Sequence, residues 1–199
     1  MPQHGKPWMA ITHRKIRPMN DNSITSRPIS PIPADTLDRN LAIARPNKDE
    51  SLAHVGIVGD TYTILLSGAD TDGRYCLVDM LVPPGGGPPP HRHDFEESFT
   101  MLEGEIEVTF RGKKSVLRKG ETANVPANAP HFFTNASKES ARLLCICSPA
   151  GQEELFLEVG VPVATRTSQA PKPDKAAEAE MKAKVAALLP KFRTQMVGP

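Results

Sequence analysis

The chain has 199 residues, with 24 lysines and arginines against 23 aspartates and glutamates, for a formal charge of +1. This balance argues against nucleic acid or another polyanion as a partner, and no run of about 18 apolar residues predicts a membrane span. Three cysteines are too few for a disulfide framework, and the N-terminus lacks the apolar run of a secretory signal. We therefore expect a cytoplasmic protein with one main domain and extensions.

Residues 1–48 are expected to form a proline-rich, extended N-terminal arm. The few apolar residues among the first thirty, such as Trp8 and Ile16, follow no sustained period, so the segment buries too little apolar surface to fold alone. An edge strand draped over a partner barrel is one role for it. A targeting peptide is another, although the prolines at 2, 7 and 18 oppose the amphipathic helix that such peptides need.

Strand signals begin near Val55, within a predicted domain of residues 49–165. The segments TYTILLSG and YCLVDMLV are separated by ADTDGR, whose Asp72-Gly73 pair predicts a hairpin. Further strands are predicted at residues 97–103, 105–110, 141–151 and 153–159, the last from EELFLEV. His54, at the edge of the first strand, is expected to be solvated or locally hydrogen-bonded.

The stretch PPGGGPPPHRHDFEE contains the first group of candidate metal ligands. Side chains alternate faces along a strand, so His91, His93 and Glu97 point the same way, whereas Glu96 points the other way. A bulge at residues 94–95 would reverse the choice between the two glutamates. Two imidazoles and a carboxylate suit a divalent first-row metal rather than calcium, and the three prolines restrict the backbone that leads into the site.

A fourth ligand is predicted in GETANVPANAPHFFTN, which contains His131, the one histidine downstream of this group. If a compact barrel places this strand antiparallel to the first, His131 completes a set of three histidines and one glutamate. Even spacing along the strands places Phe99, Met101 and Phe133 on the same face as the ligands. There they would line the inner wall of the barrel or form part of its core. Cys145 and Cys147 share one face, where a core role is favoured over a Cys-x-Cys metal site.

These residues resemble the two motifs of the cupin family. The first motif is matched at the required spacing by Gly85, His91, His93, Glu97 and Gly104. The second is matched by Gly120, Pro126, His131 and Asn135. The one departure is Asn128, where the family usually has glycine; because asparagine tolerates a left-handed backbone, we expect the turn to survive.

The resemblance implies an all-β fold, a single cupin barrel of the double-stranded β-helix or jelly-roll type. It also implies that His91, His93, Glu97 and His131 bind one divalent transition metal, such as Fe, Mn, Ni, Co or Zn. Within the family, HRHDFEE, PHFFTN and SPAGQEE resemble quercetin 2,3-dioxygenases. Because cupin barrels carry many functions, the reaction needs separate support.

We expect a dioxygenase that acts on a small hydroxylated or enolisable substrate, with dioxygen as the second reactant. Glu97 would bind the metal or act as a catalytic base. Two alternatives stay open, a non-catalytic small-molecule-binding cupin and a metal-dependent isomerase. Open barrel edges and the arm favour a homodimer.

Residues 166–199 are predicted to form a linker followed by a helix from Asp174 to Leu189. Asp174 can cap its N-terminus, the segment is rich in alanine, and Pro190 ends it. An apolar stripe that includes Met181 and Val185 is expected to pack on the barrel or on a second subunit.

Overall fold

A computed structural model of the chain describes residues 31–171 and 174–198. The chain divides into two compact units, Met1–Arg39 and Asn40–Pro199. Residues 31–39 contain neither helix nor strand. The predictions of a proline-rich arm and of a targeting peptide fall mainly on residues 1–30, which lie outside the described residues. Among the described residues, no helix combines the length and the apolar character needed to cross a membrane.

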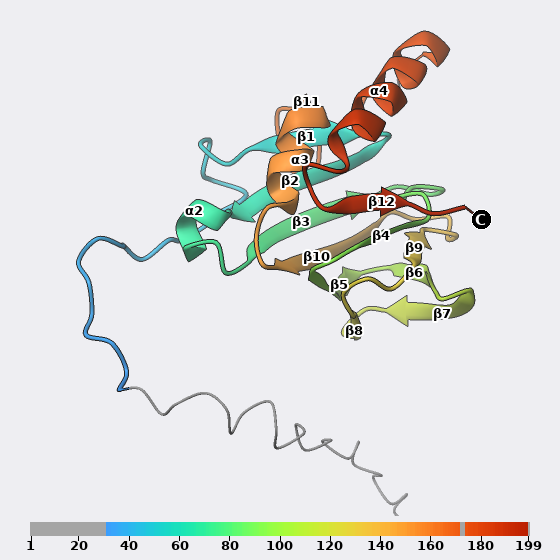
Figure 1. The fold of residues 1–199 in the computed structure, drawn as a ribbon. Helices are drawn as coiled ribbons and strands as arrows, with labels where there is room; N and C mark the ends of the chain where they lie inside the picture. The colour runs from blue at the N-terminus through green and yellow to red at the C-terminus, as the bar shows by residue number, and fades with distance from the viewer. Residues whose placement is uncertain (1–30, 172–173, 199) are drawn as a thin grey trace, which may run out of the picture. The chain divides into compact units, whose positions relative to one another are not determined.

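The second unit is built on two antiparallel sheets (Figure 1). Seven strands form the first sheet, in the order β11 (Val161–Pro162), β1 (His54–Ile57), β2 (Asp60–Leu66), β3 (Cys76–Val82), β10 (Ala141–Ser148), β5 (Glu96–Glu103) and β8 (Thr122–Val125). Five strands form the second, in the order β12 (Thr194–Met196), β4 (His91–His93), β9 (His131–Thr134), β6 (Glu105–Phe110) and β7 (Lys113–Arg118). This architecture confirms the predicted all-β cupin jelly roll.

The core lies between the two sheets because each strand buries alternate side chains. In β10, for example, Leu143, Cys145 and Cys147 are buried, whereas Ile146 is exposed. Phe99 on β5 and Phe133 on β9 meet edge to face across the core, with ring centroids 5.3 Å apart and planes at 76°. Both phenylalanines are therefore core residues that join one sheet to the other.

One of the sequence predictions was wrong. The segment EELFLEV forms α3 (Gln152–Val159), a helix in which Leu155 and Val159, four residues apart, are buried. The predicted hairpin at ADTDGR is confirmed, since β2 and β3 on either side of it pair antiparallel, but their connection contains a helical turn, α2 (Gly68–Thr71). Its first turn is held by Asp70, whose carboxylate accepts hydrogen bonds from the amide and hydroxyl of Ser67 at 2.8 and 2.7 Å.

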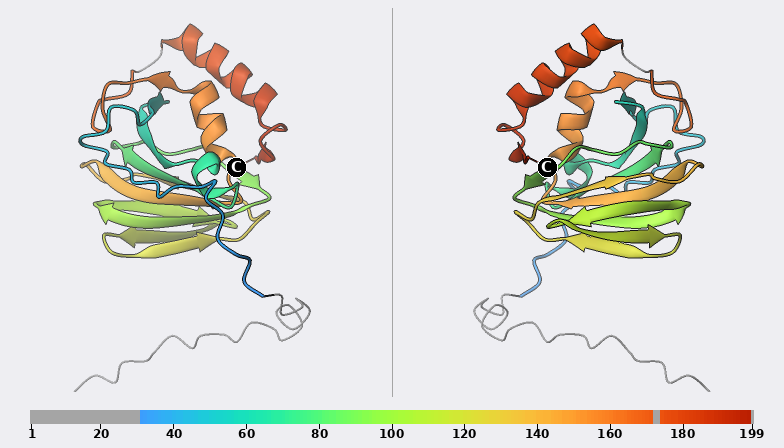
Figure 2. Two further views of the ribbon diagram at one scale, coloured as in Figure 1. Left: turned by 90° about the vertical axis from the view of Figure 1, so that its left-hand side faces the viewer. Right: turned by 90° about the vertical axis from the view of Figure 1, so that its right-hand side faces the viewer.

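The C-terminal helix α4 (Lys175–Leu188) confirms the predicted helix and its cap. The Asp174 carboxylate accepts hydrogen bonds from the amides of Ala176 and Ala177 at 3.0 and 2.9 Å. Together α3 and α4 lie on one side of the sheets (Figure 2). Apolar residues that lie on these helices or follow them form a small second core: Leu155, Val159, Leu189 and Phe192.

Strand β12 was missed because it is three residues long and has one apolar side chain. It pairs with β4 so that Thr194 lies opposite His93 and Met196 lies opposite His91. The amide of Val197 donates a hydrogen bond to the carbonyl of Pro90 at 3.1 Å. The C-terminal segment therefore forms part of the sheet that contains the two candidate ligands of β4.

Candidate metal centre

The loop before β4 is shaped by its glycines. Gly85 and Gly87 have φ of 78° and 126°, which is a backbone conformation that side chains disfavour. A Cβ on Gly87 would lie 2.2 Å from the carbonyl oxygen of Phe133, so β9 approaches the loop too closely for any other residue. This contact fixes the loop against the strand that contains His131. The prolines that follow lead directly into His91.

The chain crosses from one sheet to the other between His93 and Glu97. His93 ends β4 in the five-stranded sheet, and Glu96 begins β5 in the seven-stranded sheet. The strand is thus interrupted at residues 94–95. The side chain of Glu97 nevertheless points to the same side as those of His91 and His93, and Glu97 is buried with 5% of its surface exposed. Glu96 instead points outward, where its carboxylate accepts hydrogen bonds from Asn124 Nδ2 and the Ala127 amide at 2.8 and 3.1 Å.

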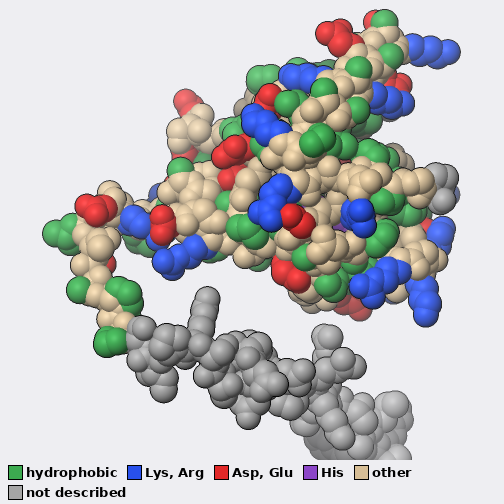
Figure 3. All heavy atoms as spheres, viewed as in Figure 1, with side chains coloured by type: hydrophobic (Ala, Val, Ile, Leu, Met, Phe, Trp, Pro, Cys, Tyr) green, Lys and Arg blue, Asp and Glu red, His purple; other side chains and the backbone are tan. Residues whose placement is uncertain are grey.

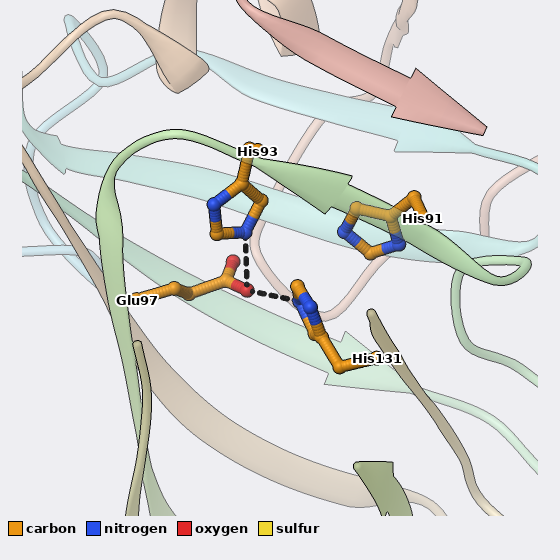
Figure 4. Close-up of side chains that lie close together, drawn as sticks. All are labelled: His91, His93, Glu97 and His131. Atoms are coloured by element: carbon orange, nitrogen blue, oxygen red, sulfur yellow. Dashed lines mark hydrogen bonds and ion pairs between the residues drawn. The ribbon is translucent and has the colours of Figure 1, made fainter. Parts of the chain in front are cut away.

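The structure brings all four predicted ligand side chains together (Figure 4). His91 on β4 lies opposite His131 on β9 in the strand register. One ligand atom from each of His91, His93, Glu97 and His131 lies within 4.8 Å of the others. Glu97 Oε2 lies 3.2 Å from His93 Nε2 and 2.9 Å from His131 Nε2. This cluster could hold a metal ion.

Each of the three imidazoles is oriented by a main-chain carbonyl two residues away. The Nδ1 atoms of His91, His93 and His131 lie 2.9 Å from the carbonyl oxygens of Pro89, Phe95 and Ala129, respectively. Because a carbonyl only accepts, Nδ1 is the protonated nitrogen in each neutral ring, and the lone pair of Nε2 is free. Such a hydrogen bond on the remote nitrogen is typical of histidines that bind metals.

A cation fits this arrangement. With Nδ1 already donating, the neutral Nε2 atoms of His93 and His131 are acceptors, and each faces another acceptor, Glu97 Oε2, at hydrogen-bond distance. Acceptors that face each other repel unless a proton or a metal ion lies between them. Three nitrogens and a carboxylate oxygen form the donor set that divalent transition metals prefer.

Without a metal, protons on the imidazoles take the place of the cation. Burial would raise the pKa of Glu97, but hydrogen bonds and positive charge from His131 and His93 outweigh it and hold the pKa well below its usual range. Burial lowers the pKa of His91 to about 4, so its ring is neutral near neutral pH. Burial would also lower the pKa of His131, but the pairing with Glu97 raises it.

The second oxygen of Glu97 faces the buried cysteines. Cys145 Sγ lies 3.3 Å from Glu97 Oε1, and Cys147 Sγ lies 3.7 Å from Cys145 Sγ. Cys147 lowers the pKa of the Cys145 thiol, but burial and the Glu97 charge raise it, to about 12 overall. Without a metal, Cys145 is therefore a protonated thiol that donates to Glu97. Glu97, Cys145 and Cys147 also place one ligand atom each within 4.8 Å of one another, so this second group could hold a metal ion as well.

Two other side chains complete the description of the site. Phe95, which sequence reasoning missed, stacks on His93 with ring centroids 3.8 Å apart and planes at 3°. His54, as expected, is locally hydrogen-bonded, with Nδ1 2.7 Å from Thr63 Oγ1. It takes no part in the cluster.

Of the four clustered residues, His91 also lines a cavity of about 720 Å³ between the barrel and the C-terminal segment. The cavity is bounded by residues of β1 and β2, by Pro88–Pro90, by α3 and α4, and by Thr194 and Met196 of β12. On the face of the molecule in Figure 3, acidic and basic side chains are interspersed, and little histidine surface is visible. The imidazoles are therefore largely screened from solvent on that face.

The jelly-roll barrel, with three histidines and one glutamate brought together between its two sheets, has the architecture of the cupin class of proteins. A family model described as "Cupin domain" matches residues 78–147, which contain all four clustered residues. KdgF from a Halomonas species shares the fold, with a TM-score of 0.50 and 16% identity over 58% of this chain and 99% of that chain. Residues 78–147 therefore form a cupin domain.

The curated relatives are similar to parts of the chain. An uncharacterized protein of Aquifex aeolicus is 37% identical over 73 residues, which are 35% of this chain and 60% of that protein. Quercetin 2,3-dioxygenase of Bacillus subtilis is 29% identical over 101 residues, which are 50% of this chain and 30% of the enzyme. The curated relatives that the chain matches are covered over 27% to 66% of their own lengths.

Proposed function

We propose that the chain is a metal-dependent cupin of the dioxygenase type, which acts on a small hydroxylated or enolisable organic molecule. His91, His93, Glu97 and His131 would hold one divalent transition metal. The observation that carries the proposal is the orientation of the imidazoles, each fixed through Nδ1 with Nε2 directed at the same point. The similarity to quercetin 2,3-dioxygenase over half of the chain supports the choice of reaction.

A divalent ion in this site would supply open coordination positions for oxygen ligands and stabilise negative charge on them. With one carboxylate opposite a dication, the site is net positive, which favours enolates, hydroxyketones and carboxylates over neutral or cationic ligands. The histidines would position that charge, and the stacked Phe95 ring keeps His93 in place.

We further propose that Glu97 acts as the general base that removes a proton from the substrate. The substrate must lose a hydroxyl proton to bind as an enolate, and a carboxylate oxygen within the cluster can accept that proton. The Cys145 thiol, 3.3 Å from Oε1, orients the carboxylate so that Oε2 faces the imidazoles. Glu97 would therefore combine metal binding with proton transfer.

The test is oxygen uptake by protein loaded separately with iron, manganese, nickel or cobalt, with flavonols and enediols as substrates. We expect uptake with at least one metal, and its loss together with metal in His91→Ala and His131→Ala. His54→Ala is the matched control, because His54 lies outside the cluster. Absence of uptake with every metal and substrate would contradict a dioxygenase.

A non-catalytic small-molecule-binding cupin is the second candidate. The cavity beside His91 favours it, since a cavity of about 720 Å³ can retain a ligand without any reaction. Its signature is a small molecule that copurifies with the metal-loaded protein and is released unchanged on denaturation. Conversion of that molecule in air would favour the dioxygenase.

A further inference from the structure

Two buried oxygen atoms in the wall of the cavity lack a hydrogen-bond partner. Asp60 Oδ1 and Gln152 Oε1 accept no hydrogen bond of good geometry among the described residues, although the Gly87 amide acts on the Asp60 carboxyl and the two residues are only 2% and 8% exposed. Both residues line the cavity that reaches His91. Because an unpaired buried acceptor costs free energy, a site that retains two of them is suited to a ligand with donors.

The two acceptors belong to one continuous wall. Tyr62 donates its hydroxyl proton to Asp60 Oδ2 at 3.1 Å, and its ring packs edge-on against Phe156, with centroids 4.9 Å apart. Phe156 lies four residues after Gln152, on the same face of α3. Contacts between β2 and α3 thus bring Asp60 and Gln152 to the same side of the cavity.

The remainder of the cavity is predominantly apolar. Its apolar side chains come from the barrel, α3 and α4 and include Ile57, Leu155, Val159, Met181, Val185 and Leu189. Glu178 and Lys182 on α4 also contribute, with opposite charges, so the charged residues of the helix do not select for either sign. Such a lining, with few polar groups, is typical of sites for apolar molecules that are oriented by a small number of hydrogen bonds.

We propose that Asp60 and Gln152 are specificity-determining residues that form hydrogen bonds with hydroxyl groups of an apolar, ring-containing substrate, whose other end reaches His91. This inference rests on the proposed function and adds the recognition of the end of the substrate that lies away from the metal. Burial raises the pKa of Asp60 to about 7, against the effects of Tyr62 and the Gly87 amide. A protonated carboxyl can both donate and accept a hydrogen bond, as a hydroxyl group can, so it matches a hydroxyl better than an ammonium group.

The experiment compares two probes that differ in their hydroxyl groups. Quercetin and 3-hydroxyflavone share the enol beside a carbonyl, which would face the metal, but only quercetin has hydroxyls on its other rings. Dissociation constants are measured by calorimetry on metal-loaded, full-length protein without oxygen, so that no turnover occurs. The variants are Gln152→Leu and Asp60→Asn, with Glu154→Gln as the control on the exposed face of α3.

We expect each cavity variant to weaken quercetin binding by about 3- to 10-fold, the value of one hydrogen bond, and 3-hydroxyflavone binding by less than about 2-fold. Glu154→Gln should change neither. Two variants are used because Asp60 packs against the loop and its replacement can affect folding, whereas Gln152 is the first residue of a helix. Equal losses for both probes, no loss with Gln152→Leu, or no binding of either probe would overturn the inference.

Oxygen uptake measured in parallel separates this inference from the proposed reaction. Hydroxyl-dependent binding without oxygen consumption would contradict the dioxygenase and support the recognition site. Oxygen consumption with an unchanged preference for quercetin in both variants would overturn the recognition site alone.

Discussion

Glu97 Oε2 lies 2.9 Å from His131 Nε2, although the two residues are 34 positions apart and come from strands of different sheets. This contact closes the cluster across the interior of the barrel. His131 is fixed on its other side by the Ala129 carbonyl. Metal affinity should therefore depend on the carboxylate as strongly as on the imidazoles.

Replacing Glu97 by glutamine should lower metal affinity by at least about 100-fold, since the variant loses a charged ligand at a buried site. Glu96→Gln provides a matched control, because the adjacent carboxylate points outward to Asn124 and the Ala127 amide. Elemental analysis after identical loading and dialysis measures the effect. Loss of metal from the Glu96 variant, with retention in the Glu97 variant, would show that the assignment of ligands is wrong.

Cys145→Ala should weaken metal binding by about 10-fold, because Glu97 Oε1 loses the thiol that orients it. Cys145→Ser keeps a donor at the same position and should restore most of the affinity. Competition with a chromophoric chelator gives the constants. Cys76→Ala is the comparison for packing, since Cys76 is equally buried; the same loss in that variant would point to core disruption.

The buried carboxyl of Asp60 should make the protein less stable as the pH rises from about 4 to about 7. Burial raises its pKa from 3.8 to about 7, so the folded state binds the proton more tightly than the unfolded state over this range. The loss of unfolding free energy from this group is at most about 4 kcal/mol, and it levels off above pH 7.

The Asp60 effect is measured as a difference. Urea unfolding of metal-free wild-type protein and of Asp60→Asn is followed at several pH values, and subtraction removes the contribution of the histidines. The wild type should lose more stability than the variant between pH 5 and pH 7. Parallel curves for the two proteins would mean that Asp60 ionises normally.

Gly87→Ala should destabilise the fold by more than about 2 kcal/mol, because the new Cβ meets the Phe133 carbonyl oxygen at 2.2 Å and φ is 126°. Gly85→Ala separates the two causes, since Gly85 also has a positive φ but nothing lies within 4 Å of an added Cβ. Its cost should be about 1 kcal/mol. Equal costs in urea unfolding would rule out the steric explanation.

We propose that the chain forms the homodimer expected from its sequence, and that exposed apolar side chains near the beginning of the described chain take part in it. Ile32 and Leu37 are 95% and 92% exposed. Replacing both by serine should shift the protein from dimer toward monomer in light scattering coupled to gel filtration. A wild-type protein that is monomeric at micromolar concentration would contradict this proposal.

The cluster could be predicted from sequence because His91, His93 and Glu97 lie an even number of residues apart, as side chains on one face of a strand do. That argument assumed one strand through residues 91–97, whereas the chain changes sheets at residues 94–95. The two irregular residues preserve the parity, so Glu97 still faces inward. Asn128, with φ of 68°, adopts the left-handed conformation that was expected of it.

The cavity could not be predicted because it depends on contacts between distant segments. EELFLEV has apolar residues at both strand and helix spacing, so its local pattern does not show that Gln152 and Phe156 share a face. Asp60 appears in the sequence as an ordinary polar residue before a strand. Only the packing of β2 against α3 places its carboxyl beside the Tyr62 hydroxyl.

Strand β4 pairs with β9 through a single residue pair, His91 with His131, but with β12 through three. During synthesis, His91 and His93 leave the ribosome about 100 residues before the strand that supplies most of their pairing. All four ligand residues are therefore synthesised before β12, and until β12 appears β4 lacks most of its strand pairing. Metal capture should accordingly be a late event, which follows the pairing of β12 with β4.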